Sequence, residues 1–125
     1  MDARKLVLRF YDEVAGAGHV ELLPELLADG FVLHGAPGGD VSGTEPVARN
    51  VRALRAAFEG LTFDIGDVVA EDDRVAARWT MRGTHTGDFH GIAPTGKPIE
   101  QNGMVFYRVA GDRLAEQWIL TQPMA

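Results

Sequence analysis

Four histidines are the side chains of this sequence whose charge can change near neutral pH, so they are the first candidates for proton transfer. They are His19, His34, His85 and His90. His34 closes a short apolar run that begins at Phe31, and we expect it to act as an acid or a base; a ring held by a neighbouring loop is the alternative. The spacing lacks the His-x-x-x-His pair of a helical zinc site, and we predict no bound metal.

Composition excludes several other chemistries. The 125-residue chain has no cysteine, which removes disulfides, thiolate metal sites and cysteine nucleophiles. Its formal charge is -6 and it has no cluster of Lys and Arg, so we do not expect nucleic acid as a partner. No glycine-rich phosphate-binding motif follows a strand and opens a helix, so we predict a protein that works without a cofactor.

The length of the chain fits a single domain over residues 1–125. Its N-terminal region lacks the apolar core of a secretory signal, and no segment is long and apolar enough to cross a membrane. We therefore expect a cytoplasmic protein without a membrane partner. The carboxylates that can be placed fall in turns, as in the run Glu71–Asp73, or on the outer sides of strands.

Apolar residues at helical spacing predict three helices in the first half of the chain. The first covers 3–15, with Leu6, Phe10 and Val14 on its apolar stripe, and the second covers 20–27. The third has Thr44 as its N-cap and runs to about residue 59. A short strand at 31–34 and a glycine-rich loop at 35–43 lie between the second and third helices.

From Leu61 the period of the apolar pattern changes to two, which predicts strands. After the first of these, strands are expected at 75–84, 99–109 and 114–121, with a long loop at 87–96 and a hairpin turn at 110–112. Helices followed by an antiparallel meander indicate an α+β fold in which the helices pack on one face of a curved sheet.

Alternation along the strands predicts which side chains face the helices. Val75, Ala77, Trp79 and Met81 should face inward. The inward positions of the last two strands also include polar side chains, namely Gln101, Tyr107, Gln117 and Thr121. An unsatisfied buried polar group costs about 1–3 kcal/mol, so we predict a pocket holding water or ligand rather than a solid core.

The outward positions of the same strands carry large apolar side chains, which are Met104, Phe106, Trp118 and Leu120. A contiguous apolar patch on a surface marks an interaction site. We therefore expect a homodimer formed through the outer face of the sheet.

Several segments resemble motifs of one known family. Residues 71–79 read EDDRVAARW, close to the family pattern EGDRVAARW, and 82–89 and 91–97 resemble its RGTHTGEF and GIPPTGR elements. Residues 10–14 (FYDEV) and 116–118 (EQW) resemble FYEEV and EHW. On these motifs, which span nearly the whole chain, the protein resembles SnoaL-like polyketide cyclases of the nuclear-transport-factor-2-like superfamily. The resemblance implies a cone-shaped fold that encloses a small, largely apolar molecule.

Ring-closing members of this family are similar in using an inward aspartate on the last strand as general acid and base, one residue after the tryptophan of EHW. That position is Ile119 here, and the position before Trp118, often histidine in the family, is Gln117. An intramolecular aldol step needs a base that removes a proton from the carbon next to a carbonyl group. The resemblance places a polar pocket residue at His34, near the mouth of the cone, which leaves His34 as the candidate catalytic residue.

The remaining candidates are expected to bind the substrate. They are Tyr11, Asn50, Trp79, His85, Gln101, Tyr107, Gln117 and Ile119. The amides can hydrogen-bond oxygen atoms without a change of charge, which suits positioning rather than proton abstraction. His85 is expected at the rim of the pocket, and a purely structural role for it stays open.

These features give three hypotheses. The first is a polyketide cyclase-like enzyme that acts on an aromatic or polycyclic ketone, by acid/base catalysis or by positioning alone. The second is a small-molecule binding protein without catalysis, which the isoleucine at 119 favours. The third is an epoxide hydrolase or isomerase on the same fold, which would require an inward carboxylate paired with an arginine.

Overall fold

The computed structural model describes residues 2–35 and 39–123, and the chain begins with a helix that widens halfway along. In helix α1 (Ala3–Arg9), the Asp2 carboxylate caps the first turn by accepting the Arg4 N–H at 2.9 Å. The helix continues as the π-helix η1 (Phe10–Gly16). Its buried side carries two adjacent pairs, namely Phe10 with Tyr11 and Val14 with Ala15. The helix predicted over 3–15 is therefore present, with a π-helical second half.

The second predicted helix is shorter than its apolar spacing indicated. The 3-10 turn η2 (Val20–Leu22) leads into the single turn α2 (Leu23–Leu26), and strand β1 (Leu27–His34) follows at once. Leu27 is extended because it pairs with Leu114 on the last strand. This long-range pairing overrides the local helical pattern and makes the strand longer than the predicted 31–34.

The third helix forms as predicted but with a different cap. Helix α3 (Thr44–Ala57) includes Thr44 as its first residue, and Gly43, whose φ is 87°, takes the cap position. The helix ends at Ala57 because Phe58 already belongs to the next strand. Within the loop predicted over 35–43, Val41–Ser42 forms the short strand β2 against β1, and residues 36–38 lie outside the described residues.

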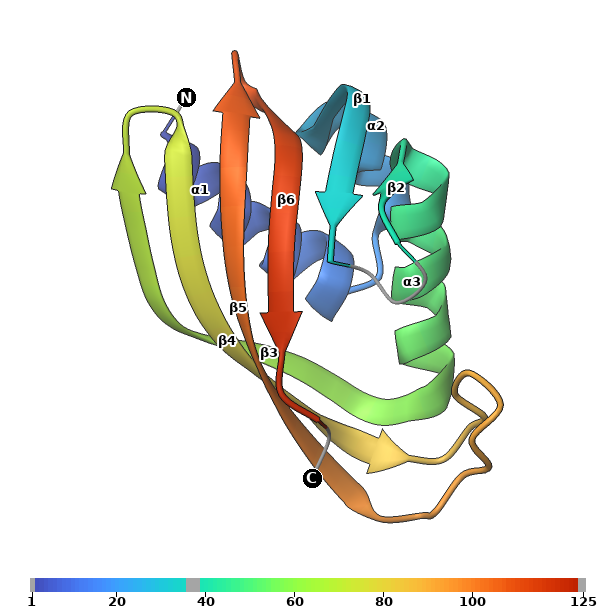
Figure 1. Cartoon of the computed structure of the whole chain (residues 1–125). Coiled ribbons are helices and arrows are strands. Elements are labelled where there is room, and N and C mark those ends of the chain that lie inside the picture. The colour runs from blue at the N-terminus through green and yellow to red at the C-terminus, as the bar shows by residue number, and fades with distance from the viewer. Residues whose placement is uncertain (1, 36–38, 124–125) are drawn as a thin grey trace.

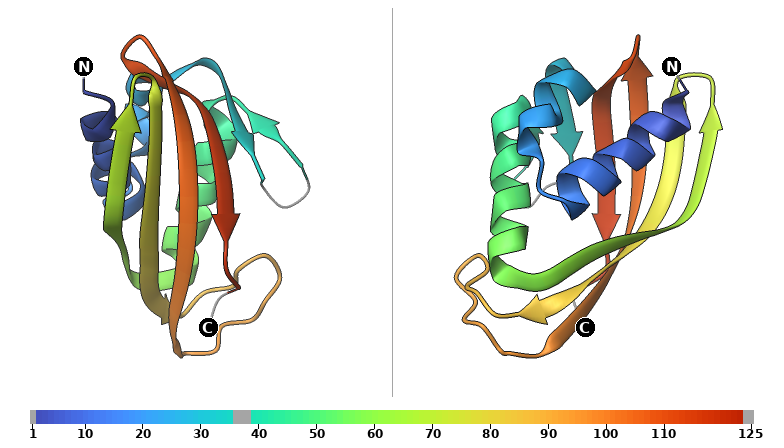
Figure 2. Two further views of the ribbon diagram at one scale, coloured as in Figure 1. Left: turned by 60° about the vertical axis from the view of Figure 1, so that its left-hand side comes forward. Right: turned by 180° about the vertical axis from the view of Figure 1, so that it is seen from behind.

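Within the described residues six strands form one mixed sheet, in the order β2-β1-β6-β5-β4-β3. The predicted meander is present as β3 (Phe58–Glu71), β4 (Arg74–His85), β5 (Pro98–Ala110) and β6 (Arg113–Thr121), all antiparallel to their neighbours in the chain. β1 joins this meander parallel to β6. The helices cover one face of a curved sheet, whose other face is turned to the viewer in Figure 1 and away in the right-hand view of Figure 2.

The alternation of the long strands agrees with the prediction. The inward side chains of β4, which are Val75, Ala77, Trp79 and Met81, are all buried under the helices. The outward Arg78 and Arg82 are exposed and pair with Asp67 and Asp64 of β3. In the described part of the chain no helix is long and apolar enough to cross a membrane.

Candidate functional site

Three aromatic side chains predicted to bind substrate meet on the inner face of the sheet. The hydroxyl oxygens of Tyr11 in η1 and Tyr107 in β5 lie 2.7 Å apart, and Trp79 of β4 donates its indole N–H to the Tyr11 oxygen at 3.2 Å. Tyr11 is 5% exposed and Tyr107 is fully buried at 0%. Each was predicted separately, and the fold joins them into one hydrogen-bonded trio.

The trio has one more donor hydrogen than it uses. Trp79 contributes an indole N–H, and Tyr11 and Tyr107 each contribute an O–H. The indole hydrogen goes to Tyr11, and a single hydrogen bond joins the two hydroxyl groups. Whichever tyrosine donates in that bond, the O–H of the other has no acceptor among the described residues. One phenol hydrogen of this buried pair is therefore unused.

Burial keeps both phenols protonated. Desolvation raises the pKa of Tyr11 from 10.0 to about 12, against the smaller opposing effect of its hydrogen bonds to Tyr107 and Trp79. Desolvation is the main cause that raises the pKa of Tyr107 well above its ordinary value, and the electrostatic effect of Tyr11 raises it further. The two phenols are thus neutral donors at physiological pH and cannot serve as bases.

These pKa values predict an unusual tyrosine titration. Tyr11 and Tyr107 are the only two tyrosines in the sequence, so the ultraviolet absorbance of tyrosinate reports on them alone. We expect no tyrosinate to form in the folded protein near pH 10, where free tyrosine titrates. Because the unfolded chain loses these protons first, the free energy of unfolding should fall as pH rises above about 10. A normal titration near pH 10 with the fold intact would contradict the burial of the pair.

Gln117 of β6 is the neighbour of this trio on the next strand. It pairs with Tyr107 across β5 and β6, and directly opposed side chains lie about 4.5–5.5 Å apart at Cβ. Gln117 is only 7% exposed, yet its amide makes no hydrogen bond to a described residue, and its polar atoms are not among the fully enclosed ones. The amide therefore has free donors and acceptors beside the tyrosine pair, in space that a water molecule can reach.

Several apolar side chains that pack against the core are not fully buried. They come from five elements and are Leu33, Leu54, Phe63, Ile99 and Ile119. For comparison, Met81 lies in the filled part of the core and is only 1% exposed. Ile119 lies two residues beyond Gln117 on the same side of β6. Next to the unpartnered amide, the side of β6 that faces the helices is thus only half-buried at Ile119.

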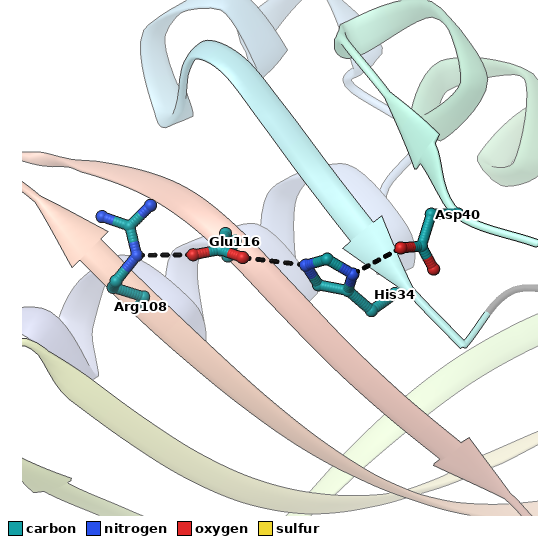
Figure 3. Close-up of polar contacts among 4 residues, drawn as sticks. All are labelled: His34, Asp40, Arg108 and Glu116. Atoms are coloured by element: carbon teal, nitrogen blue, oxygen red, sulfur yellow. Dashed lines mark hydrogen bonds and ion pairs between the residues drawn. The ribbon is translucent and has the colours of Figure 1, made fainter.

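The position expected for His34 at the mouth of a cone is wrong. His34 is aligned with Trp118 of β6 and stacks on its ring, with ring centroids 5.1 Å apart and planes at 19°. Its Nδ1 lies 2.7 Å from Asp40 and its Nε2 lies 2.8 Å from Glu116, whose other oxygen accepts from Arg108 (Figure 3). These partners lie on the outer face, so His34 cannot transfer protons on the inner face.

The structure separates the other predicted binding residues from the trio. Asn50 of α3 is exposed. Gln101 of β5 is half-buried, and its amide already donates to the Gln122 carbonyl at 3.0 Å. His85, expected at a rim, is 6% exposed with its ring centroid 5.2 Å from that of Phe58, and its Nε2 has no partner among the described residues. It borders a separate hollow of about 270 Å³ beneath the loop at 87–96.

A second hollow of about 630 Å³ lies on the outer face of the sheet rather than between sheet and helices. It is lined mainly by outward apolar side chains, and Met104, Phe106, Trp118 and Leu120 are all exposed, as the alternation predicted. We call this hollow the outer groove. His34 forms part of its wall.

Ionisable groups suited to catalysis are scarce on the inner face. All 18 carboxylate side chains of the sequence lie in the described residues, and none of them is buried. The half-buried ones, Glu13 and Glu116, pair with Arg9 and Arg108. No group of three or more His, Asp or Glu side chains in the described ranges is arranged to hold a metal ion. The inner site therefore consists of neutral hydrogen-bond donors and acceptors.

Comparison with known families accounts for this architecture. A model of SnoaL-like polyketide cyclases matches residues 5–125 of the chain. The chain belongs to the SnoaL-like polyketide cyclase family. No curated protein sequence gives a significant match.

Solved structures of SnoaL-like proteins superpose closely on this member of the family. IdmH from Streptomyces antibioticus, a candidate polyketide cyclase, is 29% identical with a TM-score of 0.84, over 98% of this chain and 93% of that chain. A candidate polyketide cyclase from Acidithiobacillus ferrooxidans is 30% identical with a TM-score of 0.82, over 96% and 87%. A candidate SnoaL-like cyclase from Jannaschia sp. CCS1 shares the fold at 24% identity and a TM-score of 0.85, over 96% and 85%.

Two features of this SnoaL-like chain were not predicted. One is the bonding of Tyr11 to Tyr107 and Trp79, which carries no local signal because the contacts span 96 and 68 residues. The other is the outward direction of His34, for which a signal exists. Since Phe31 is a large apolar residue expected to face inward, alternation places His34, three residues on, on the opposite side.

Proposed function

We propose that this protein binds an aromatic or polycyclic ketone on the inner face of the sheet and promotes its cyclisation without a cofactor. The observation that carries the proposal is the unused phenol hydrogen of the Tyr11–Tyr107 pair beside the unpartnered amide of Gln117. In this proposal both groups donate to one ketone oxygen. Apolar neighbours such as Leu33 and Ile119 suit the hydrocarbon part of such a ligand.

The proposed chemistry depends on neutral donors. When a proton leaves the carbon next to a ketone, negative charge develops on the ketone oxygen. Donors already aimed at that oxygen bind the enolate more tightly than the ketone, which lowers the barrier. Because no carboxylate is buried and His34 faces outward, the proton would go to water or to a basic oxygen of the substrate. The protein would then contribute polarisation of the carbonyl and a folded, near-attack shape of the chain.

A binding protein without turnover is the second candidate. Ile119 favours it, because this position holds the inward aspartate in the ring-closing proteins that the chain resembles. The epoxide hydrolase hypothesis is not retained, because it requires an inward carboxylate paired with an arginine, and every carboxylate is exposed or half-buried.

The binding step can be tested with 1-tetralone as an aromatic ketone probe. We expect its infrared carbonyl stretch to move to lower frequency on binding, since hydrogen bonds weaken the C=O bond. Gln117→Ala and Tyr11→Phe should each reduce this shift and weaken binding in calorimetry by about three- to tenfold. Asn102→Ala removes an outward amide from the neighbouring strand and should change neither measurement. An unshifted carbonyl stretch in the wild-type complex would contradict the proposed site.

Catalysis and plain binding are distinguished by hydrogen exchange. Deuterium incorporation at the α-carbon of bound 1-tetralone, followed by NMR, reports enolate formation directly. Exchange faster than in buffer, and slowed by Gln117→Ala, supports an enzyme. A shifted carbonyl stretch with exchange no faster than in buffer identifies the protein as a binding protein.

A further inference from the structure

The loop between β4 and β5, residues 86–97, is fastened at both ends above the hollow that His85 borders. At its start, the Thr86 N–H donates to the Ala57 carbonyl oxygen at 2.9 Å, which ties the loop to the end of α3. At its base, the His85 N–H donates to the Lys97 carbonyl oxygen at 3.0 Å. Figure 2 shows the loop folded back beside the end of α3. We call the space beneath it, about 270 Å³ in volume, the loop hollow.

Apolar side chains make up most of the wall of the loop hollow. Phe58 and Phe89 contribute two aromatic rings whose centroids are 5.1 Å apart. The other apolar members are Ile92, Pro98 and Ile99. The volume is close to the lower end of the range for small-molecule sites. The loop hollow therefore suits a molecule about the size of one substituted aromatic ring.

The polar part of the wall offers hydrogen-bond donors. It consists of His85, Thr95 and Lys97, and no carboxylate of a described residue lines the loop hollow. None of the ion pairs among the described residues uses the Lys97 ammonium group. The Thr95 hydroxyl oxygen already accepts a hydrogen bond from the Lys97 backbone N–H at 3.3 Å, so its own O–H is left to donate. Both groups favour a negatively charged or acceptor group.

His85 is the most enclosed of these polar residues. Its side chain is only 6% exposed, and its Nε2 is fully enclosed without a hydrogen-bond partner among the described residues. Its Nδ1 is not among the fully enclosed atoms. A hydrogen on Nε2 would have no acceptor, and buried N–H groups without a partner are rarer in proteins than buried acceptors without one. We therefore expect the ring hydrogen on Nδ1, which makes His85 a third donor.

We propose that the loop hollow is a second ligand site, which binds a small aromatic carboxylate. In this proposal the ring of the ligand lies against Phe58 and Phe89, and its carboxylate accepts hydrogen bonds from His85 Nδ1, Thr95 and Lys97. A carboxylate only accepts hydrogen bonds, so it matches a wall whose available polar groups donate. Hydrogen bonds to an ionised acceptor are also stronger than those to a neutral one.

The loop hollow is separate from the inner site. Its member Ile99 lies opposite Gly83, and Gly83 is four residues along β4 from Trp79 of the aromatic trio. Four residues of an extended strand span about 13 Å. The two sites can therefore be disabled by different substitutions and probed with different molecules.

Benzoate is the probe for the loop hollow, and the chain has only two lysines, Lys5 and Lys97, to report on it. Reductive methylation with a ¹³C label keeps their charge and makes both visible by NMR. We expect benzoate to shift the Lys97 signal in a saturable way, with a dissociation constant of about 0.1–1 mM, and to leave the signal of Lys5 in α1 unchanged. A Lys97 signal that benzoate does not move would overturn the proposal.

Calorimetry of the unmodified protein measures the contribution of the lysine charge. Lys97→Gln should weaken benzoate binding by about three- to tenfold, because it removes a charge-assisted hydrogen bond. Lys5→Gln is the matched control and should leave the affinity unchanged. Equal losses in the two variants would indicate an effect of net charge and would contradict a contact at Lys97.

Two further ligands test the chemical class. Acetate has the charge without the ring, and benzamide has the ring without the charge. Each should bind at least about tenfold more weakly than benzoate. If acetate or inorganic phosphate bound as well as benzoate, Lys97 would be attracting any anion. If benzamide did so, the site would recognise only an apolar ring. Either result would refute a carboxylate site.

The role of His85 has a test of its own. His85→Phe keeps an aromatic ring but removes the donor, and it should weaken benzoate binding about three- to tenfold, with circular dichroism used to check the fold. His19→Phe changes an exposed histidine outside the loop hollow and is the control. In the wild type, ¹⁵N NMR of the histidine rings should show the His85 hydrogen on Nδ1 and a change of that signal on binding. A hydrogen on Nε2 in the complex would refute the assigned contact.

Gln117→Ala distinguishes this site from the inner one. It lies on the inner face beside Tyr107 and should leave the affinity for benzoate unchanged. If Gln117→Ala weakened benzoate binding and His85→Phe did not, benzoate would occupy the inner site and the loop hollow would not be a ligand site. Benzoate binding that survives Gln117→Ala would support the loop hollow even if 1-tetralone did not bind at all.

Discussion

Replacing Gly103 with valine is expected to lower the free energy of unfolding by about 1–3 kcal/mol and to disorganise the inner site. Gly103 lies opposite Trp79 across β4 and β5, and a Cβ at this position would come within 2.6 Å of the indole Cη2. The better strand propensity of valine is worth at most about 1 kcal/mol, so overpacking decides the outcome. Displacing Trp79 also removes its hydrogen bond to Tyr11, and the carbonyl shift of bound 1-tetralone should shrink.

A double mutant identifies the cause of that loss. Trp79→Phe removes the part of the ring that would collide, so Gly103→Val combined with Trp79→Phe should be more stable than the sum of the two single effects by about 0.5–3 kcal/mol. Gly66→Val is the control, because Gly66 is exposed and its close neighbour is the flexible side chain of Arg78. Urea unfolding measures all four variants. Additive effects of Gly103→Val and Trp79→Phe would show that the collision is not the cause.

Replacing Ile119 with aspartate is expected to give the inner site the base that it lacks. The side chain would stand two residues from Gln117 on the same side of β6, in half-buried apolar surroundings. We expect α-proton exchange of bound 1-tetralone to accelerate by about a hundredfold to ten-thousandfold, which is the usual contribution of a positioned base. The rate should increase with pH as the aspartic acid ionises.

The same substitution should destabilise the fold in a pH-dependent way. Burying a carboxyl group costs about 1–3 kcal/mol, and desolvation raises its pKa above that in the unfolded chain. The folded state therefore holds the proton longer, and the free energy of unfolding should fall as pH rises from about 4 to 7. Ile119→Asn has a similar shape without a base and is the control. Equal exchange rates for the aspartate and asparagine variants would show that the ketone does not bind beside position 119.

Most of the fold could be predicted because strand alternation is local. Placing Trp79 inward and Arg78 outward needs only neighbouring residues, and the structure agrees along β4, β5 and β6 except at the end of β6, where Thr121, predicted to face inward, is exposed. The segment predicted as a helix over 20–27 is helical up to Leu26, as a 3-10 turn followed by one α-helical turn, and it ends there because Leu27 gains a strand partner, Leu114, that local spacing cannot reveal. The sequence pointed to four residues of the candidate site, Tyr11, Trp79, Tyr107 and Gln117. It did not predict the hydrogen bonds that join Tyr11 to Trp79 and to Tyr107.

By itself, the sequence determined the family, the succession of helices and strands, and the division of the long strands into an apolar inner side and a mixed outer side. These properties depend on residue type and short-range periodicity, which folding leaves unchanged. Only the tertiary structure decided that Tyr11 meets Tyr107 and that His34 bridges Asp40 and Glu116 on the outer face. The physical reason is that β1 pairs in parallel with β6 and that Tyr11 of η1 meets Tyr107 of β5, and such contacts depend on the register between segments far apart in the chain.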